Sequence, residues 1–204
     1  MNTGAILQLE SQSTFLLNPV TDKGSRAKDD VSFWTPQPIQ GFSWLGMFAV
    51  PNYNPAPSGA TFLEKSAGAY SRPLLAPPVG FNQVWTCVGD GQPSNLGIYS
   101  LQAPPGYIGL GTIAVPDFNS PPMLGNYPNL MCVRQDLCKQ VSVSTVVWND
   151  QGSGAPLDVT VFMLPTAQIA AAFVANGYPG SATVWDLDPD KVAYVGDLQS
   201  EEAV

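Results

Sequence analysis

The chain has 204 residues, a length that fits one domain or two small ones, and it carries sixteen acidic residues against eight basic ones. The net charge of −8 opposes binding to a phosphate backbone and general attraction to an anionic membrane, so no nucleic-acid partner is expected. The 19 Gly and 20 Pro residues are too many for a helical protein and are typical of short strands joined by turns.

The first eleven residues lack both the basic region and the apolar region of a secretory signal. The apolar stretch at residues 169–175 is far shorter than the ~18 residues that span a bilayer. We therefore expect a soluble protein with no visible signal peptide, either cytoplasmic or released by a route that uses no signal.

An internal repeat organises the chain. Residues 41–54 recur as residues 106–119, and residues 22–31 recur as residues 150–159, with residues 89–96 as a shortened middle copy. The offsets, 65 and 128, give one period of about 64 residues. We therefore predict a single domain of three units, approximately 12–70, 80–138 and 143–197, followed by a disordered tail at 198–204.

Each unit is expected to contain four short strands, because β-branched and aromatic residues lie between turn residues. The pattern is clearest in the middle unit, at 83–88, 97–101, 107–115 and 130–134. In the third unit residues 167–175 favour a short helix, with strands resuming at 184–185 and 192–195. One such sheet cannot bury its inner face alone. The predicted fold is an all-β β-prism with pseudo-threefold symmetry, made of three four-stranded antiparallel sheets.

Three phrases carry a resemblance to a known family. Residues 148–154 read W-x-D-x-G-S-G, residues 104–111 read P-x-G-(aromatic)-x-x-L-G, and residues 132–134 read C-V-(basic). These phrases resemble the vacuolar-protein-sorting "sixty-two" family, over roughly residues 20–165, and more distantly the β-prism modules of multivesicular-body subunits and bacterial pore-forming proteins. The resemblance implies a β-prism and a link to membrane trafficking or membrane attack, and it brings no catalytic residues.

Enzymatic chemistry is poorly provided for. The chain has no histidine, which excludes Ser-His-Asp and Cys-His catalysis and the usual zinc sites. Asp22, Asp30, Asp150 and Asp158 could form a glycosidase pair or a calcium site, but their equal spacing in two repeats is typical of structural turn residues. We expect no enzyme, no cofactor and no metal.

The three cysteines, Cys87, Cys132 and Cys138, are an odd number without dense spacing. This favours buried or half-buried free thiols over a disulfide scaffold. A bridge between Cys132 and Cys138 stays open as an alternative in an oxidising compartment.

Two loop aromatics, Tyr53 and Phe118, follow Ala-Val-Pro in equivalent units and are candidate ligand-binding residues. One interpretation is that they enter a lipid interface or stack on a sugar ring. The alternative is that each ring folds back and fills the open end of the prism. The third unit lacks this motif, which would make one side of that end different.

A basic cluster, Lys23, Arg26 and Lys28, lies in the first copy of the Gly-Ser turn and is a candidate site for a phosphate headgroup. The alternative is a solvated loop that neighbouring Asp residues neutralise.

Two functions follow from these observations. The first is a membrane- or glycan-recognition module with a lipid or glycan partner, acting alone or beside a pore-forming protein partner, for which insecticidal use would fit. The second is a structural or trafficking adaptor that binds protein through a prism face. The low charge of the sheet faces also makes a homo-oligomer an open alternative.

Overall fold

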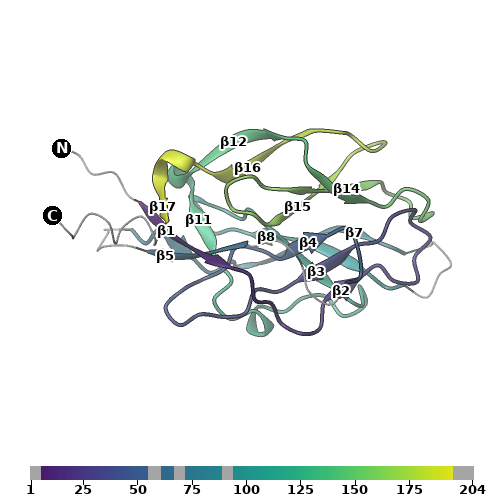
Figure 1. Cartoon of the computed structure of the whole chain (residues 1–204), viewed down its shortest axis with the longest axis horizontal. Helices are drawn as coiled ribbons and strands as arrows, with labels where there is room; N and C mark the ends of the chain where they lie inside the picture. Colours follow the sequence, from purple (N-terminus) through teal and green to yellow (C-terminus); the bar gives the residue numbers. More distant parts are fainter. Residues whose placement is uncertain (1–5, 55–60, 67–71, 89–93, 195–204) are drawn as a thin grey trace.

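The computed structural model describes residues 6–54, 61–66, 72–88 and 94–194, which form an all-β arrangement (Figure 1). Among these residues no helix is long and apolar enough to cross a membrane. The helical segments are three 3-10 turns: η1 (Leu124–Asn126), η2 (Gln135–Leu137) and η3 (Pro189–Lys191). The all-β prediction is confirmed, while the expected tail at 198–204 lies outside the described residues.

The strands follow the predicted order within a few residues in the middle unit. They are β1 (Leu7–Gln12), β2 (Val20–Thr21), β3 (Ser32–Trp34), β4 (Phe48–Val50), β5 (Thr61–Ser66), β6 (Leu75–Ala76), β7 (Gly80–Thr86), β8 (Gly97–Gln102), β9 (Tyr107–Ile108), β10 (Thr112–Val115), β11 (Cys132–Arg134), β12 (Cys138–Val143), β13 (Val146–Asn149), β14 (Val159–Met163), β15 (Ala170–Val174), β16 (Ala182–Leu187) and β17 (Val192–Tyr194).

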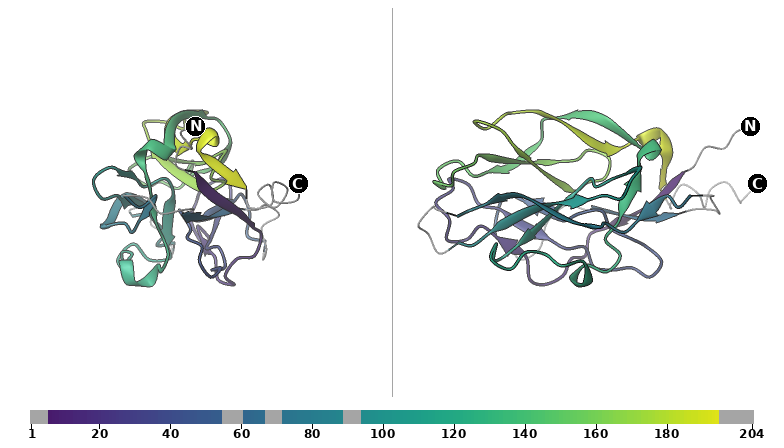
Figure 2. Two further views of the ribbon diagram at one scale, coloured as in Figure 1. Left: turned by 90° about the vertical axis from the view of Figure 1, so that its left-hand side faces the viewer. Right: turned by 180° about the vertical axis from the view of Figure 1, so that it is seen from behind.

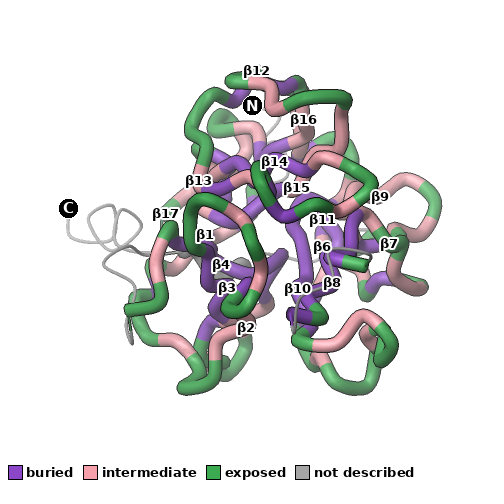
Figure 3. Tube along the Cα trace, turned by 90° about the vertical axis from the view of Figure 1, so that its right-hand side faces the viewer, coloured by how far each residue is buried: buried purple, intermediate pink, exposed green. Residues whose placement is uncertain are grey.

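Three of the sheets are equivalent. The first unit forms β2-β3-β4, the middle unit forms β7-β8-β10, and the third unit forms β13-β14-β15, all antiparallel. The repeat also fixes the register, since Phe33 pairs with Ala49 as Ile98 pairs with Ala114, 65 residues later. Seen from one end, the strands of the three units lie in three groups around a common centre (Figure 3).

Toward the other end each unit adds a second sheet. These are β17-β1-β5, β6-β11-β9 and β12-β16, and β1 pairs with β17 in parallel. In the middle unit β8 is the central strand of the first sheet, between β7 and β10. In the second sheet β11 is the central strand, between β6 and β9. The sheets have two or three strands instead of the expected four: the strand predicted at 107–115, for example, is divided into β9 and β10, which belong to different sheets. Figure 2 shows the strands along the length of the molecule from two further sides.

The helix predicted at 167–175 is wrong. Residues Ala170–Val174 form β15, which pairs with β14. The Ala170 amide donates to the carbonyl of Met47, the residue directly before β4, at 2.9 Å. The alanine-rich run favours a helix by propensity alone. In the fold its small side chains allow β15 to lie against the strands of the other units, so tertiary packing outweighs the local preference.

The units meet through close backbone contacts and buried aromatic side chains. A Cβ added at Gly46 would lie 2.6 Å from the Cα of Gly111, its equivalent 65 residues later. The Trp85 indole donates to the Leu157 carbonyl (2.8 Å), and the equivalent Trp148 indole donates to the Asp29 carbonyl (2.8 Å). Each tryptophan therefore joins its own unit to the turn of the next.

None of the three cysteines forms a disulfide in the described part of the chain; Cys87 and Cys132 are buried and Cys138 is half-buried. This agrees with the expectation of buried or half-buried thiols. Burial raises the pKa of Cys132 to about 12, which keeps that thiol protonated at neutral pH.

Candidate functional site

The turn between β2 and β3 is built around Asp22, whose side chain is buried. Its Oδ1 accepts the Val31 amide (2.9 Å), and its Oδ2 accepts the Ser25 hydroxyl (2.9 Å). The Ser25 Oγ in turn accepts the Ala27 amide at 3.2 Å. The carboxylate thus supplies acceptors for a turn that would otherwise leave buried donors without partners.

The turn between β13 and β14 repeats this network around Asp150. Its Oδ1 accepts the Val159 amide (2.8 Å), and its Oδ2 accepts the Ser153 hydroxyl (2.9 Å). Gly24 and Gly152 both have a φ of 93°, a conformation that favours glycine. Asp22 and Asp150 therefore have the structural role in Gly-Ser turns that their spacing indicates.

The middle turn has Cys87 where the outer turns have aspartate. The backbone hydrogen bond is retained, because the Cys87 amide donates to the Leu96 carbonyl at 3.1 Å, as Asp22 does to Val31 and Asp150 does to Val159. The Cys87 Sγ lies 2.8 Å from the Ser94 carbonyl, to which it donates. A neutral side chain therefore fills the position of the carboxylate.

The two outer turns lie at one end of the molecule with the described parts of the middle turn and of the loops that follow β4, β10 and β15 (Figure 3). This end is here called the turn end. Tyr53 lies there, 37% exposed, and its hydroxyl donates to the Asp22 Oδ1 at 2.7 Å. Burial and then the hydrogen bond to Asp22 raise the pKa of Tyr53. The tether fixes the ring while leaving part of it open to solvent.

Phe118 occupies the equivalent loop of the middle unit, with its amide bonded to the Asn95 carbonyl at 2.8 Å. Its ring is half-buried and packs against the main hydrophobic cluster. The two predicted loop aromatics thus lie at the same end, Tyr53 tethered and partly open, Phe118 packed more deeply.

The third unit also brings an aromatic side chain to this end. The Tyr178 hydroxyl donates to the Asp158 Oδ1 at 3.1 Å, and Asp158 is the equivalent of Asp30. Burial and the charges of Asp150 and Asp158 raise the pKa of Tyr178 to about 12. Tyr178 could not be found from the sequence, because the preceding strand Ala170–Val174 reads as a helix and the third unit lacks the Ala-Val-Pro motif.

The basic residues Lys23, Arg26 and Lys28 are exposed on the first turn. No ion pair within 4.0 Å joins any of them to an acidic side chain in the part of the chain that the structure describes. The Lys28 amide donates to the Gln151 carbonyl at 2.9 Å, so the first turn rests on the third. The three cations are therefore held at the turn end beside the aromatic loops.

The turn end offers aromatic rings, exposed carboxylates and three cations. Among the described residues no group of three or more His, Cys, Asp or Glu side chains is arranged to hold a metal ion. The buried carboxylates of Asp22 and Asp150 already accept two or more hydrogen bonds each.

The chain is similar to known proteins in sequence and in fold. The crystal structure of GNIP1Aa from Chromobacterium piscinae has a TM-score of 0.79 and 22% identity over 95% of this chain and 39% of that chain. The chain thus spans well under half of that neighbour, and the likeness supports the fold alone. No curated protein matches the chain.

A family model described as vacuolar protein sorting-associated protein 62 matches residues 3–177. The match covers most of the sequence and includes the three phrases that carry the resemblance, which is thereby confirmed. The chain belongs to the vacuolar protein sorting-associated protein 62 family.

Proposed function

We propose that the chain is a non-enzymatic recognition module whose turn end binds a glycan. The observation that carries this proposal is the pair of tyrosines, Tyr53 and Tyr178, each tethered through its hydroxyl to an aspartate of an equivalent turn. The same repeated sheets and turns support a pseudo-threefold β-prism as the framework of the site.

An aromatic ring beside carboxylates suits a polyhydroxylated ligand. A sugar presents apolar faces that pack on a ring and hydroxyl groups that donate to carboxylates. Asp29 and Asp30 are exposed close to the Tyr53 tether, and burial and hydrogen bonding hold the ring before any ligand arrives. A ring ordered in advance loses less conformational entropy on binding.

The charge at this end favours a glycan over an anionic lipid. Three cations, Lys23, Arg26 and Lys28, stand among more numerous aspartates: Asp22, Asp29, Asp30, Asp117, Asp150 and Asp158. An anionic headgroup would meet repulsion from these carboxylates, whereas neutral hydroxyl groups would gain acceptors. The basic cluster remains the candidate contact for an acidic sugar or a phosphate.

The proposal that this end is not catalytic is supported by the use of its buried carboxylates. The oxygens of Asp22 and Asp150 accept backbone and serine hydrogen bonds within their turns. A general acid or base needs a carboxyl group within reach of the substrate. These two side chains are instead committed to turn geometry.

A glycan array and liposome flotation test the proposal together. Replacing Tyr53 and Tyr178 by alanine should abolish glycan binding, and Leu17→Ala, at a side chain that is 91% exposed, should leave it unchanged. A thermal melt of each variant separates lost binding from lost folding. Retained glycan binding by a folded double variant would sink the glycan assignment, and so would binding to glycan-free liposomes that the double variant loses.

A second candidate function, an adaptor that binds protein, is favoured by an apolar groove of about 360 Å³ on the middle unit. Phe81, Tyr127 and Leu124 line it, and Met123 beside it is 64% exposed. If this groove is the binding surface, Leu124→Asp should abolish the binding of a stoichiometric protein partner. A pore-forming protein is one candidate for that partner. The tyrosine variants should then bind that partner normally.

A further inference from the structure

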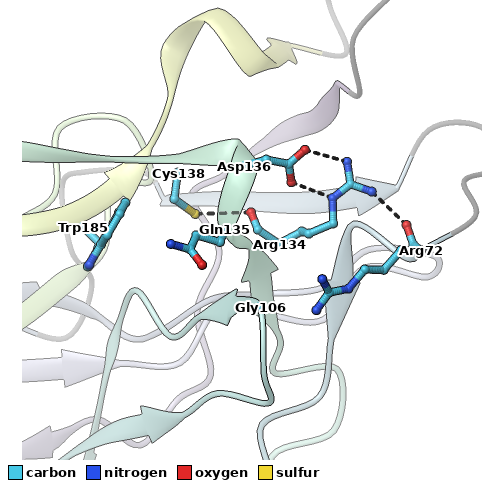
Figure 4. Close-up of a pocket in the computed structure, with 7 residues that line it drawn as sticks. All are labelled: Arg72, Gly106, Arg134, Gln135, Asp136, Cys138 and Trp185. Atoms are coloured by element: carbon cyan, nitrogen blue, oxygen red, sulfur yellow. Dashed lines mark hydrogen bonds and ion pairs between the residues drawn. The ribbon is translucent and has the colours of Figure 1, made fainter.

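A second hollow lies away from the turn end, where β9, β11 and β12 meet (Figure 4). Its volume is about 630 Å³. One wall comes from the sheet β6-β11-β9, and the other comes from β12 and β16. The lining residues are Arg72, Gly106, Arg134, Gln135, Asp136, Cys138 and Trp185. They come from distant parts of the sequence, so no local pattern marks the site.

The guanidinium group of Arg72 is held in one position. It lies 4.6 Å from the centre of the Tyr107 ring, a cation–π contact, and its Nη2 donates to the Pro105 carbonyl. The Tyr107 hydroxyl donates to the Pro73 carbonyl at 2.8 Å, which fixes the ring beneath it. The cation is thus ordered without a carboxylate partner among the described residues.

Gly106 makes room for this arrangement. A Cβ built at Gly106 would clash with the Arg72 Nη2 and would lie 2.8 Å from its Cζ. The equivalent glycine of the first unit, Gly41, has a similar φ (83° against 79°), and a Cβ there meets nothing within 4 Å. The two positions share a backbone conformation and differ in whether a side chain would displace Arg72.

The other charges of the hollow are largely matched. Arg134 forms two hydrogen bonds to Asp136, at 2.6 and 2.9 Å, and its Nη1 donates to the Arg72 carbonyl at 2.9 Å. The hydrogen bond from Arg134, together with the charge of Lys191, lowers the pKa of Asp136 despite the opposing effect of burial. The charge of the ionised Asp136 is therefore balanced by Arg134, and among the described residues that line the hollow the charge of Arg72 has no such counterpart.

The far wall is apolar. Trp185 is half-buried in the hollow, and burial followed by the charge of Asp186 raises the pKa of Cys138 to about 12, so its thiol adds no negative charge at neutral pH. A guanidinium on one side and an indole on the other suit a ligand with an anionic group and an apolar or planar part.

We propose that this hollow binds a phosphate monoester, with the phosphate on Arg72 and the organic part against Trp185. Arg72 presents several N–H donors in a planar fork, which matches phosphate oxygens. The volume is much larger than a phosphate ion requires, so a bare ion fills only the arginine side. The proposal is independent of glycan binding at the turn end.

Trp185 supplies the readout, because the four other tryptophans, Trp34, Trp44, Trp85 and Trp148, are at most 4% exposed. Phenyl phosphate should protect the fluorescence of the native chain from acrylamide, a neutral quencher, and calorimetry should give the same affinity. Inorganic phosphate should bind more weakly, and phenol should not bind. Failure of phenyl phosphate to protect Trp185 at millimolar concentration would overturn the proposal.

Variants locate the binding. Arg72→Gln, which keeps much of the side-chain length and removes the charge, should weaken phenyl phosphate binding at least tenfold. Gly106→Ala should weaken it similarly, whereas Gly41→Ala, with the same backbone strain, should bind as the native chain does. Unchanged binding by folded Arg72→Gln overturns the proposal, even if Gly106→Ala fails to fold.

The source of the phosphate is resolved with vesicles. Flotation with phosphatidylcholine containing phosphatidic acid, compared with phosphatidylcholine alone, tests a lipid headgroup. A lipid phosphate is assigned if Arg72→Gln abolishes vesicle binding while the double variant Tyr53→Ala with Tyr178→Ala still binds vesicles. Binding of phenyl phosphate without vesicle binding assigns a soluble ligand. Vesicle binding that Arg72→Gln leaves intact counts against this hollow.

Discussion

The outer turns and the middle turn are closed by the same backbone hydrogen bond and differ in the side chain at its start. Asp22 and Asp150 each accept a backbone amide and a serine hydroxyl, whereas Cys87 fills the same position in the middle unit with a thiol. The backbone hydrogen bond across the turn is nevertheless kept in all three, at 3.3, 3.1 and 3.2 Å.

The comparison teaches which features of the repeat are needed for folding and which are free to differ. The hydrogen bond across the turn recurs in every unit, and the tryptophan that joins one unit to the next recurs in two. Among the residues that the structure describes, the polar network and the tyrosine tether occur in the outer units, the tether at Tyr53 and Tyr178. Features absent from the middle unit are therefore the better candidates for a specific task.

The largest expected effect comes from breaking the contact between units. Trp148→Ala should lower the free energy of unfolding by ~3–5 kcal/mol, because it empties a buried volume and removes the hydrogen bond to Asp29. Val20 stands at the equivalent position of the first unit and is only half-buried, so Val20→Ala should cost about 1 kcal/mol. Urea denaturation measures both, and equal losses would contradict this role for the tryptophan.

A smaller effect should separate the outer turns from the middle one. Asp150→Ala leaves the buried Val159 amide without its side-chain acceptor, at a cost of ~1–3 kcal/mol. Cys87→Ala removes one heavy atom and should cost about 1 kcal/mol or less. The difference should appear in thermal melts of both variants. A Cys87 variant as unstable as the Asp150 variant would show that the polar network adds nothing.

The smallest effect is a change in alkaline stability. The pKa of Tyr178 rises from about 10 in the unfolded chain to about 12, so the folded state holds this proton more tightly. Its stabilising contribution is complete below about pH 10 and is lost as the pH rises toward 12. Tyr178→Phe should therefore reduce the fall in stability between about pH 10 and pH 12, measured as the urea midpoint at each pH. Tyr53→Phe added to it should reduce that fall further, since the pKa of Tyr53 is also raised. An unchanged slope in the double variant would exclude both tethers.

The sequence was informative wherever a feature was repeated. Residues 22–31 and 150–159 predict equivalent turns, and the structure gives them matching hydrogen bonds and glycine conformations. A sequence repeat predicts repeated backbone geometry, because each copy must satisfy the same local hydrogen-bond donors and acceptors. It also predicts that Tyr53 and Phe118 follow equivalent strands, and the structure shows both strands in the same register.

Features that depend on packing between units were not predictable in this way. Ala170–Val174 has helical propensity, and only the neighbouring units make it a strand, so Tyr178 beyond it was missed as well. The hollow around Arg72 draws on Gly106, Arg134 and Trp185, which no single segment contains. The chain must fold before these side chains share a site.

The buried thiols give the chain two internal reporters of opening. Cys87 and Cys132 are 1% and 0% exposed, so a thiol reagent reaches them only when the surrounding structure separates. Cys87 lies beside the middle turn, and Cys132 lies in β11, between β6 and β9. Their two modification rates therefore describe separate events: the loosening of the turn end and the separation of strands in the second sheet of the middle unit. If both rates coincide, the chain opens as one cooperative body.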